Sequence, residues 1–353
     1  MNFSEQIQTI LNKAQSLKRI SSEEALFLLK EADWTDIVRI ADQVRHAKLP
    51  GNRVGYTVYR IINYTNICSI LCDFCSFSRK ADAAGAYTLS LEKIREKALE
   101  AKRLGADQIF LQGGVNEDLP IEYYTEILTM LSQNLGMSVR GFSPVELVHI
   151  ANAHKLTLEE LLKIFREAGL SSVPGAGAEI LSDPIRKKLS PKKLSAKEWR
   201  DALAVCQKNG LPGSANIVIG SCESPEDIIA HLDLVRGLQD ETGGLKSFVA
   251  WTFQPQTDLF PIRHVTPMEY LKVLGLCRLY LDNIRHLEVS VLGMGKAVGE
   301  LGLHSGADDI NSIVLEENVL TSHGLTSIPE AEKFIREAGF TPYRRNLNFT
   351  CDN

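Results

Sequence analysis

Short apolar segments rich in β-branched residues alternate with longer amphipathic segments along most of this chain. The longer segments have helical periodicity, and Ser90 with Gly105, like Ser195 with Gly210, can serve as N-cap and C-terminal stop. Strands followed by helices in this order predict an α/β protein with a (β/α)8 TIM-type barrel. The alternative is a partial barrel that lacks one or both of the last two strands. The expected strands are 54–62, 107–113, 138–143, 171–178, 214–221, 247–254, 287–293 and 310–315.

The rest of the chain is expected to flank this barrel. Residues 1–50 predict an N-terminal helical cap, 51–325 the barrel, and 326–353 a C-terminal helix and tail. With 353 residues, 44% of them hydrophobic, the chain can bury a large core. We find no signal peptide and no membrane-spanning apolar run, and we expect a cytoplasmic protein. A net charge of −5 without a Lys/Arg block argues against nucleic acid and favours a small-molecule partner.

Three of the seven cysteines, Cys68, Cys72 and Cys75, lie within eight residues of the loop after the first predicted strand. Loops after strands form the mouth of a barrel, where its chemistry takes place. A structural zinc site uses four protein ligands, and a redox dithiol needs only two cysteines. Three thiolates suit a 4Fe-4S cluster with one open iron. Buried unreactive thiols or a stray metal site are the alternatives.

Three other cysteines lie outside this loop, two of them at expected core positions. Cys206 and Cys277 lie within amphipathic segments, where cysteine behaves as a small hydrophobe. Cys222 follows the fifth predicted strand near the mouth, so contact with a ligand is an alternative to a plain loop position.

The spacing Cys-x3-Cys-x2-Cys, with Phe74 before the last cysteine, resembles the signature of the radical S-adenosylmethionine (SAM) enzymes. This resemblance implies a 4Fe-4S cluster held by Cys68, Cys72 and Cys75, whose open iron chelates SAM. The reduced cluster would split the sulfonium to give a 5'-deoxyadenosyl radical, and Phe74 would lie near the cofactor. The implied partner is an electron donor such as flavodoxin or ferredoxin.

Other segments at strand ends resemble SAM-binding segments of that family. Gly113 and Gly114 resemble the glycines of a GGE-type segment that meets the methionyl amino group, although valine replaces the acidic residue here. A plain tight turn is the alternative. Glu179, in the glycine-rich PGAGAEILSD, is a candidate for the SAM ribose or amino group. Ser143 and Glu146 follow the third predicted strand at the same mouth.

The segment NIVIGSCE resembles the GxIxGxxE segment that lines the adenine in this family. Ile219, Gly220 and Glu223 match the pattern, whereas Asn216 and Val218 depart from it. Glu223 has an equally good alternative as a carboxylate at a helix N-terminus.

Within the superfamily, the chain resembles the group that contains two futalosine-route menaquinone enzymes and the deazaflavin synthase subunits. WTFQP (251–255) most resembles the cyclase of that group. The implied reaction begins with hydrogen abstraction from ribose carbon 4' of dehypoxanthine futalosine. The sugar radical then attacks the benzoate ring, and loss of an electron and a proton gives a spirocyclic product. The matching segments are INYTNIC, AYTLS, LQGG, DLPIEYY, FSPVEL, PGAGAEIL, LQDETGG, WTFQP, LDNI and LEEN.

This reaction needs a clamp for the substrate carboxylate and polar partners for the sugar. Arg60 is the first candidate for the clamp because guanidinium binds carboxylate bidentately. A structural salt bridge is its alternative. The final base is not assigned, although Glu223, Glu179 and Asp308 have suitable chemistry. The remaining candidate substrate contacts, expected at or after strand ends, are Gln112, Trp251, Gln254, His304 and Asp308.

Two departures from the group lie at the predicted mouth. Ser221 stands where the group commonly has histidine, and SVLGMG (290–295) differs from the usual segment there. Three alternatives therefore remain. They are a radical addition enzyme like aminofutalosine synthase, a divergent member with another substrate, and a non-catalytic iron-sulfur or zinc protein.

Overall fold

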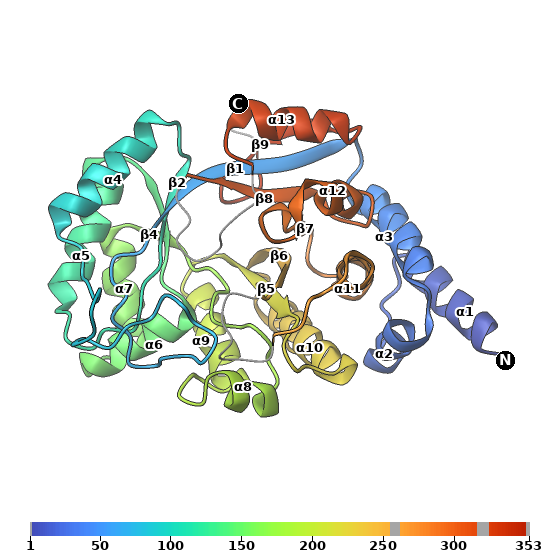
Figure 1. The fold of residues 1–353 in the computed structure, drawn as a ribbon, viewed down its shortest axis with the longest axis horizontal. Helices are drawn as coiled ribbons and strands as arrows, with labels where there is room; N and C mark the ends of the chain where they lie inside the picture. Colours follow the sequence, from blue (N-terminus) through green and yellow to red (C-terminus); the bar gives the residue numbers. More distant parts are fainter. Residues whose placement is uncertain (1, 255–261, 316–324, 351–353) are drawn as a thin grey trace.

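The computed structural model describes residues 2–254, 262–315 and 325–350 (Figure 1). Pro255 of WTFQP, residues 316–318 of LEEN and the tail from Cys351 lie outside the described residues. The strands are β1 (Arg53–Ile62), β2 (Gln108–Leu111), β3 (Ser138–Gly141), β4 (Leu170–Ser172), β5 (Gly213–Ile219), β6 (Leu245–Thr252), β7 (His286–Val289), β8 (Asp309–Val314) and β9 (Thr341–Arg344).

Helices cover the outside of these strands (Figure 1). They are α1 (Phe3–Gln15), α2 (Ser22–Glu31), α3 (Trp34–Lys48), α4 (Leu91–Arg103), α5 (Ile121–Thr129), α6 (Pro144–Ala153), α7 (Leu158–Ala168), α8 (Asp183–Leu189), α9 (Ala196–Lys208), α10 (Pro225–Thr242), α11 (Pro267–Tyr280), α12 (Val291–Leu303) and α13 (Ile328–Glu337), with a π-helical turn η1 (Met130–Asn134) after α5. Ser90 and Ser195 cap α4 and α9 as predicted: each side chain accepts a hydrogen bond from the backbone three residues on.

The strands form one parallel sheet in the order β4-β3-β2-β1-β8-β7-β6-β5. The two ends of this order, β4 and β5, are joined by a parallel bridge between Val173 and Gly213. The sheet is therefore nearly closed. Each of the eight predicted strands overlaps an observed strand, including the last two, but the predicted 171–178 overlaps β4 only at residues 171–172, and the predicted 287–293 runs into α12. The predicted (β/α)8 barrel is confirmed.

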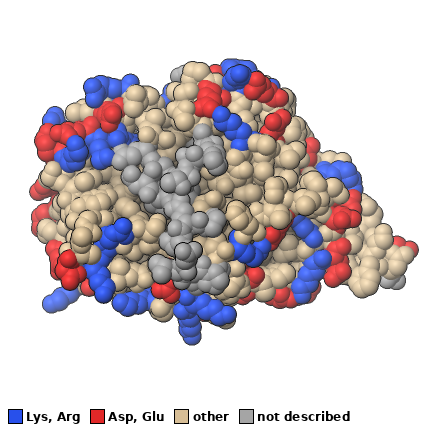
Figure 2. All heavy atoms as spheres, viewed as in Figure 1, with Lys and Arg blue, Asp and Glu red and all other residues tan. Residues whose placement is uncertain are grey.

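The N-terminal helices α1 to α3 lie at one end of the molecule (Figure 1). Helix α3 packs against α11. Gly275 of α11 allows this close approach, since a Cβ there would lie 3.1 Å from Ile37 Cγ2. None of the described helices is long and apolar enough to cross a bilayer. On the face of the molecule seen in Figure 2, acidic and basic side chains are mixed over much of the surface.

The C-terminal segment contains a strand that the sequence analysis missed. After α13, strand β9 pairs in parallel with the first residues of β1, from Arg53–Thr341 to Tyr56–Arg344. The segment TPYR is short and contains proline, which is confined to edge or terminal positions in sheets. Its position brings the following residue, Arg345, into the amino end of the barrel, where its side chain is buried.

Candidate active site

A cavity of about 300 Å³ lies inside the barrel. Alternate residues of the strands line it, as expected where successive side chains point to opposite faces. Phe74 and Cys75 of the loop after β1 line the same cavity. The interior of the barrel and the cysteine loop therefore enclose one space.

The loop between β1 and α4 carries Cys68, Cys72 and Cys75 as free cysteines, as the sequence predicted. Backbone hydrogen bonds shape it: Cys75 N–H donates to Cys72 O at 3.0 Å, and Cys68 N–H donates to Arg79 O at 3.0 Å. The Phe74 ring packs edge-on against Phe253, with centroids 5.2 Å apart. Within the described part of the chain, no three His, Cys, Asp or Glu side chains are arranged to hold a single metal ion.

Gly113 and Gly114 lie behind the cysteine loop. A Cβ on Gly114 would lie 2.2 Å from the backbone oxygen of Ile67 and 2.9 Å from Cys68 Cβ. A Cβ on Gly113 would lie 2.7 Å from the ring of Tyr64. These glycines are required because the loop packs directly on them. Contact of either glycine with a cofactor stays a prediction.

Glu146 joins the loops that follow the first three strands. Its carboxylate accepts hydrogen bonds from Tyr64 Oη at 2.8 Å, Gly113 N at 3.0 Å and Ser143 N at 2.7 Å. Burial raises the pKa of the Glu146 carboxyl, while the bonds from Ser143 and Tyr64 oppose that rise. Ser143 is the N-cap of α6 and completes a capping box with Glu146. The visible role of this pair is to hold the mouth together.

Glu179 lines the cavity and is already paired. Lys193 Nζ lies 3.0 Å from its carboxylate and 5.5 Å from the centroid of the Phe74 ring. Burial raises the pKa of the Cys72 thiol, and the charge of Lys193 opposes this rise. Lys193 is not among the residues selected from the sequence. No local pattern marks it as a buried cation behind a cysteine loop.

The NIVIGSCE segment is the end of β5 followed by a turn, residues 220–223, that is closed by its own hydrogen bonds. Ile219 is buried in the core. Gly220 has a φ of +103°, which favours glycine, and its N–H donates to Glu223 Oε1 at 2.7 Å. The other carboxylate oxygen of Glu223 accepts from Ser221 N at 2.8 Å. Asn216 and Val218, the two departures from the pattern, line the cavity, whereas the residues from Ile219 to Glu223 do not. Cys222 is exposed, and the adenine contacts stay predictions.

Arg60 faces away from the cavity. Its neighbours Tyr59 and Ile61 line the cavity, so strand alternation turns Arg60 outward onto α4. There its Nη1 donates to the backbone oxygen of Lys97 at 3.1 Å and to Glu100 Oε2 at 2.5 Å. This position matches the structural salt bridge that was the alternative to a carboxylate clamp.

His304 and Asp308 also lie away from the mouth. His304 is the C-cap of α12, and its Nε2 contacts Ala338 O at 3.0 Å. Asp308 precedes β8, so the predicted position after a strand end is wrong: it lies at the amino end of the barrel. Burial disfavours its ionisation, but the hydrogen bond from His286 and the charge of Arg278 hold the pKa of Asp308 below its usual range. Its carboxylate lies 2.5 Å from Arg278 and 2.6 Å from His286.

Three of the predicted substrate contacts do line the cavity: Gln112, Trp251 and Gln254. Gln254 Nε2 donates to Thr252 Oγ1 at 2.9 Å and to Gly293 O at 3.2 Å. Gly293 belongs to the SVLGMG segment, so this departure from the group pattern lies at the cavity wall.

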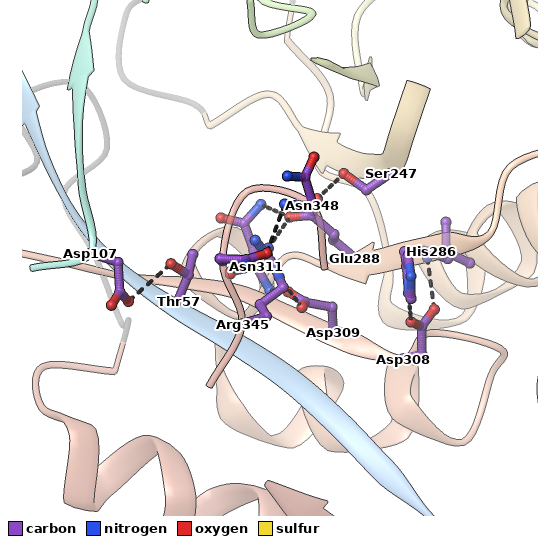
Figure 3. Close-up of polar contacts among 12 residues, drawn as sticks. Thr57, Asp107, Ser247, His286, Glu288, Asp308, Asp309, Asn311, Arg345 and Asn348 are labelled. Carbon is purple, nitrogen blue, oxygen red and sulfur yellow. Dashed lines mark hydrogen bonds and ion pairs between the residues drawn. The ribbon is translucent and has the colours of Figure 1, made fainter. Parts of the chain in front are cut away.

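Polar residues that the sequence analysis did not select line the part of the cavity toward the amino ends of the strands. Arg140 on β3, Ser214 on β5, Glu288 on β7 and Asn311 on β8 are among them. Figure 3 shows Glu288 with Ser247 and Asn311 beside the Arg345–Asp309 pair. Arg140 lies within the predicted strand 138–143, but alternation there does not show which of the two faces is the inner one.

Comparison with known proteins decides the family. The family described as "Radical SAM superfamily" matches residues 62–235, and "CofH/MqnC C-terminal region" matches residues 242–353. The chain is 36% identical over 348 residues to "Cyclic dehypoxanthine futalosine synthase" of Halalkalibacterium halodurans. The aligned region covers 97% of this chain and 94% of that protein. The chain belongs to the radical SAM superfamily. It is a radical SAM enzyme, and its cofactors are a 4Fe-4S cluster and SAM.

Further relatives are similar over comparable lengths. Cyclic dehypoxanthine futalosine synthase of Streptomyces coelicolor is 35% identical, covering 97% of this chain and 88% of that protein. A Methanothermobacter thermautotrophicus protein named 5-amino-6-(D-ribitylamino)uracil–L-tyrosine 4-hydroxyphenyl transferase is 34% identical, covering 98% of each.

Solved structures share the fold. The hydrogenase maturase HydG of Carboxydothermus hydrogenoformans matches with a TM-score of 0.79 at 17% identity, covering 98% of this chain and 81% of that chain. Methylornithine synthase matches with a TM-score of 0.72 at 21% identity, covering 95% and 97%. At these identities the likeness concerns the fold alone.

The cysteine loop of this radical SAM enzyme fits such a cluster chemically. It offers three free thiols in the loop after β1, and Cys75 is at the cavity wall. Thiolate sulfur is the usual protein ligand of iron-sulfur clusters. Gly114 leaves room for this loop where any side chain would displace Cys68.

Proposed function

We propose that the chain is a radical SAM cyclase that converts dehypoxanthine futalosine to its cyclic, spiro form in menaquinone biosynthesis. The observation that carries the proposal is the near-full-length likeness to two proteins of that name, at 36% and 35% identity. The Trp-Thr-Phe-Gln segment, of which Trp251 and Gln254 line the cavity, supports it.

In this proposal Cys68, Cys72 and Cys75 hold the cluster. When bound, the cluster and SAM supply a radical that abstracts a hydrogen atom from the substrate. Phe74 and Cys75 place this chemistry at the cavity wall. Glu179, held by Lys193, offers a fixed carboxylate on the same wall for a polar group of SAM.

The chain's own residues then bind and enclose the substrate. Gln112, Trp251 and Gln254 line the space and offer amide and indole groups to the sugar. Tyr59, Phe110 and Trp251 provide aromatic surface against the benzoate ring. The aromatic and aliphatic side chains of the wall would help to keep water from a carbon radical. We also infer that an electron donor of the flavodoxin or ferredoxin type reduces the enzyme.

The test is anaerobic turnover of the reconstituted enzyme with SAM, a strong reductant and dehypoxanthine futalosine. We expect 5'-deoxyadenosine and a product two hydrogens lighter than the substrate. A Cys72→Ala variant should lose both, whereas Cys277→Ala, a buried cysteine within α11, should keep both if it folds. Formation of 5'-deoxyadenosine without conversion of this substrate would refute the proposed reaction and leave the enzyme class intact.

The likeness to the hydroxyphenyl transferases supports a second candidate. The Methanothermobacter protein covers 98% of this chain at 34% identity, close to the values for the cyclases. The same enzyme should therefore be offered 5-amino-6-(D-ribitylamino)uracil with L-tyrosine. Consumption of these compounds, and not of dehypoxanthine futalosine, would establish the transferase.

A further inference from the structure

Arg140 is a cation inside the barrel that forms no ion pair with any residue the structure describes. Its Nη2 donates to Ser214 Oγ at 2.5 Å, and its guanidinium carbon lies 5.2 Å from the centroid of the Phe110 ring. Among the described residues no carboxylate approaches it within the 4.0 Å of a salt bridge. Burial lowers the pKa of Arg140, which means that the surroundings disfavour its charge. A guanidinium nevertheless stays protonated in proteins.

The acidic group that acts on Arg140 is committed elsewhere. Glu288 contributes an attractive charge to Arg140. Its own carboxylate, however, accepts a hydrogen bond from Asn311 Nδ2 at 2.7 Å and lies 3.5 Å from Arg345 Nη2. Arg345 in turn binds both carboxylate oxygens of Asp309 (Figure 3). The guanidinium of Arg140 therefore keeps donors that no described acidic side chain takes.

A buried cation without an ion pair is costly, and a bound anion would offset that cost. The planar guanidinium matches a carboxylate through two parallel hydrogen bonds. Besides the polar groups near Arg140, the cavity offers aromatic surface: Phe110 lies beside the guanidinium, and Tyr59 and Trp251 line the same cavity. This combination of one cation and flat apolar surface fits a carboxylate attached to an arene.

We propose that Arg140 binds the carboxylate of an aromatic acid substrate, with Ser214 fixing the guanidinium and Phe110 contacting the ring. The inference rests on the proposed function, in which the substrate carries a benzoate. It also gives the substrate a direction. The acid lies at β3 inside the barrel, and the sugar points toward Cys75 and the cysteine loop.

The test compares binding to the reconstituted, cluster-loaded enzyme by titration calorimetry, without turnover. Arg140→Gln should weaken dehypoxanthine futalosine roughly 10- to 100-fold, the range expected for lost hydrogen bonds to a charged group. Arg140→Lys should restore only part of the affinity, because it keeps the charge and loses the fork. Arg60→Gln is the matched control, an arginine on the outer face of β1, and should bind like wild type.

An analogue without the carboxylate distinguishes loss of the carboxylate contact from a general loss of structure in the variant. The carboxamide analogue of the substrate should bind wild type and Arg140→Gln with similar, weak affinity. Equal binding of the acid to wild type and Arg140→Gln would overturn the inference while leaving the cyclase reaction intact.

A simple aromatic acid tests the site even if the proposed function is wrong. If wild type does not convert dehypoxanthine futalosine, 3-acetylbenzoate is titrated into the same proteins. Binding that Arg140→Gln loses and Arg60→Gln keeps supports the aromatic acid site. No binding to wild type refutes it.

Discussion

Replacing Gly114 by alanine should disrupt the cysteine loop specifically. A Cβ at this position would lie 2.2 Å from the backbone oxygen of Ile67 and 2.9 Å from Cys68 Cβ. To reach even 3.0 Å, the lower bound of real Cβ contacts, the loop backbone must move by about 0.8 Å, which is 3.0 minus 2.2. No flexible side chain can absorb this shift, since the first obstacle is main chain.

Two measurements follow from that displacement. Overpacking of this kind costs roughly 1–3 kcal/mol, so the free energy of unfolding should fall by about that amount. Ile67 directly precedes Cys68, the first proposed cluster ligand, so a backbone shift of this size that reached Cys68 would exceed the roughly 0.2 Å tolerance of metal sites. Iron and sulfide bound after reconstitution should therefore fall to less than about half of the wild-type value.

Gly237→Ala is the matched control for this experiment. Gly237 is an exposed residue in α10, and a Cβ there would meet nothing within 4 Å. Alanine favours helix over glycine, so this variant should gain about 0.5–1 kcal/mol and load iron normally. A Gly114→Ala protein with full iron content and unchanged stability would refute the steric argument and the role assigned to this glycine.

Three further predictions concern stability. His231 is buried, and burial lowers its pKa to about 3. Between pH 6.5 and 3 the unfolded chain therefore binds a proton that the folded protein does not. The free energy of unfolding should fall by about 2 kcal/mol from pH 7 to pH 5. Denaturant titration at both pH values should show a smaller decrease in His231→Asn, and an equal one would contradict the linkage. Arg345→Met leaves the buried Asp309 carboxylate without its ion pair and should cost roughly 3–5 kcal/mol, recovered in part by adding Asp309→Leu; no recovery would point to lost packing instead. Ser195→Ala removes the cap of α9 and should cost about 1 kcal/mol, against less than about 0.5 for the exposed Lys197→Ala on the same helix.

Local patterns were sufficient for the barrel and for the placement of the cysteine loop. Periodicity of two and of 3.6 residues depends only on neighbours in sequence, so all eight barrel strands and the caps Ser90 and Ser195 could be predicted. The position of Cys68, Cys72 and Cys75 after β1 follows from the same strand assignment. Strand β9 was missed because four residues with a proline carry no periodic signal.

The cavity wall could not be predicted as well. Barrel strands are covered on both faces, by the interior and by the helices, so the apolar pattern does not show which face a polar residue takes. One step along a strand separates Arg60, which binds α4, from Tyr59 and Ile61, which line the cavity. Glu223 shows the same ambiguity, because it hydrogen-bonds its own turn instead of lining the cavity.

The chain's periodicity, cysteine spacing and capping residues are local properties, and from them the barrel and its class of chemistry can be read directly. The pairing of Glu179 with Lys193, the Arg345–Asp309 pair at the amino end and the hydrogen bond from the Arg140 guanidinium to Ser214 depend on packing. Each of these contacts joins groups from different strands or loops. Their partners are set by distance in space, which follows only once the sheet has closed around its interior.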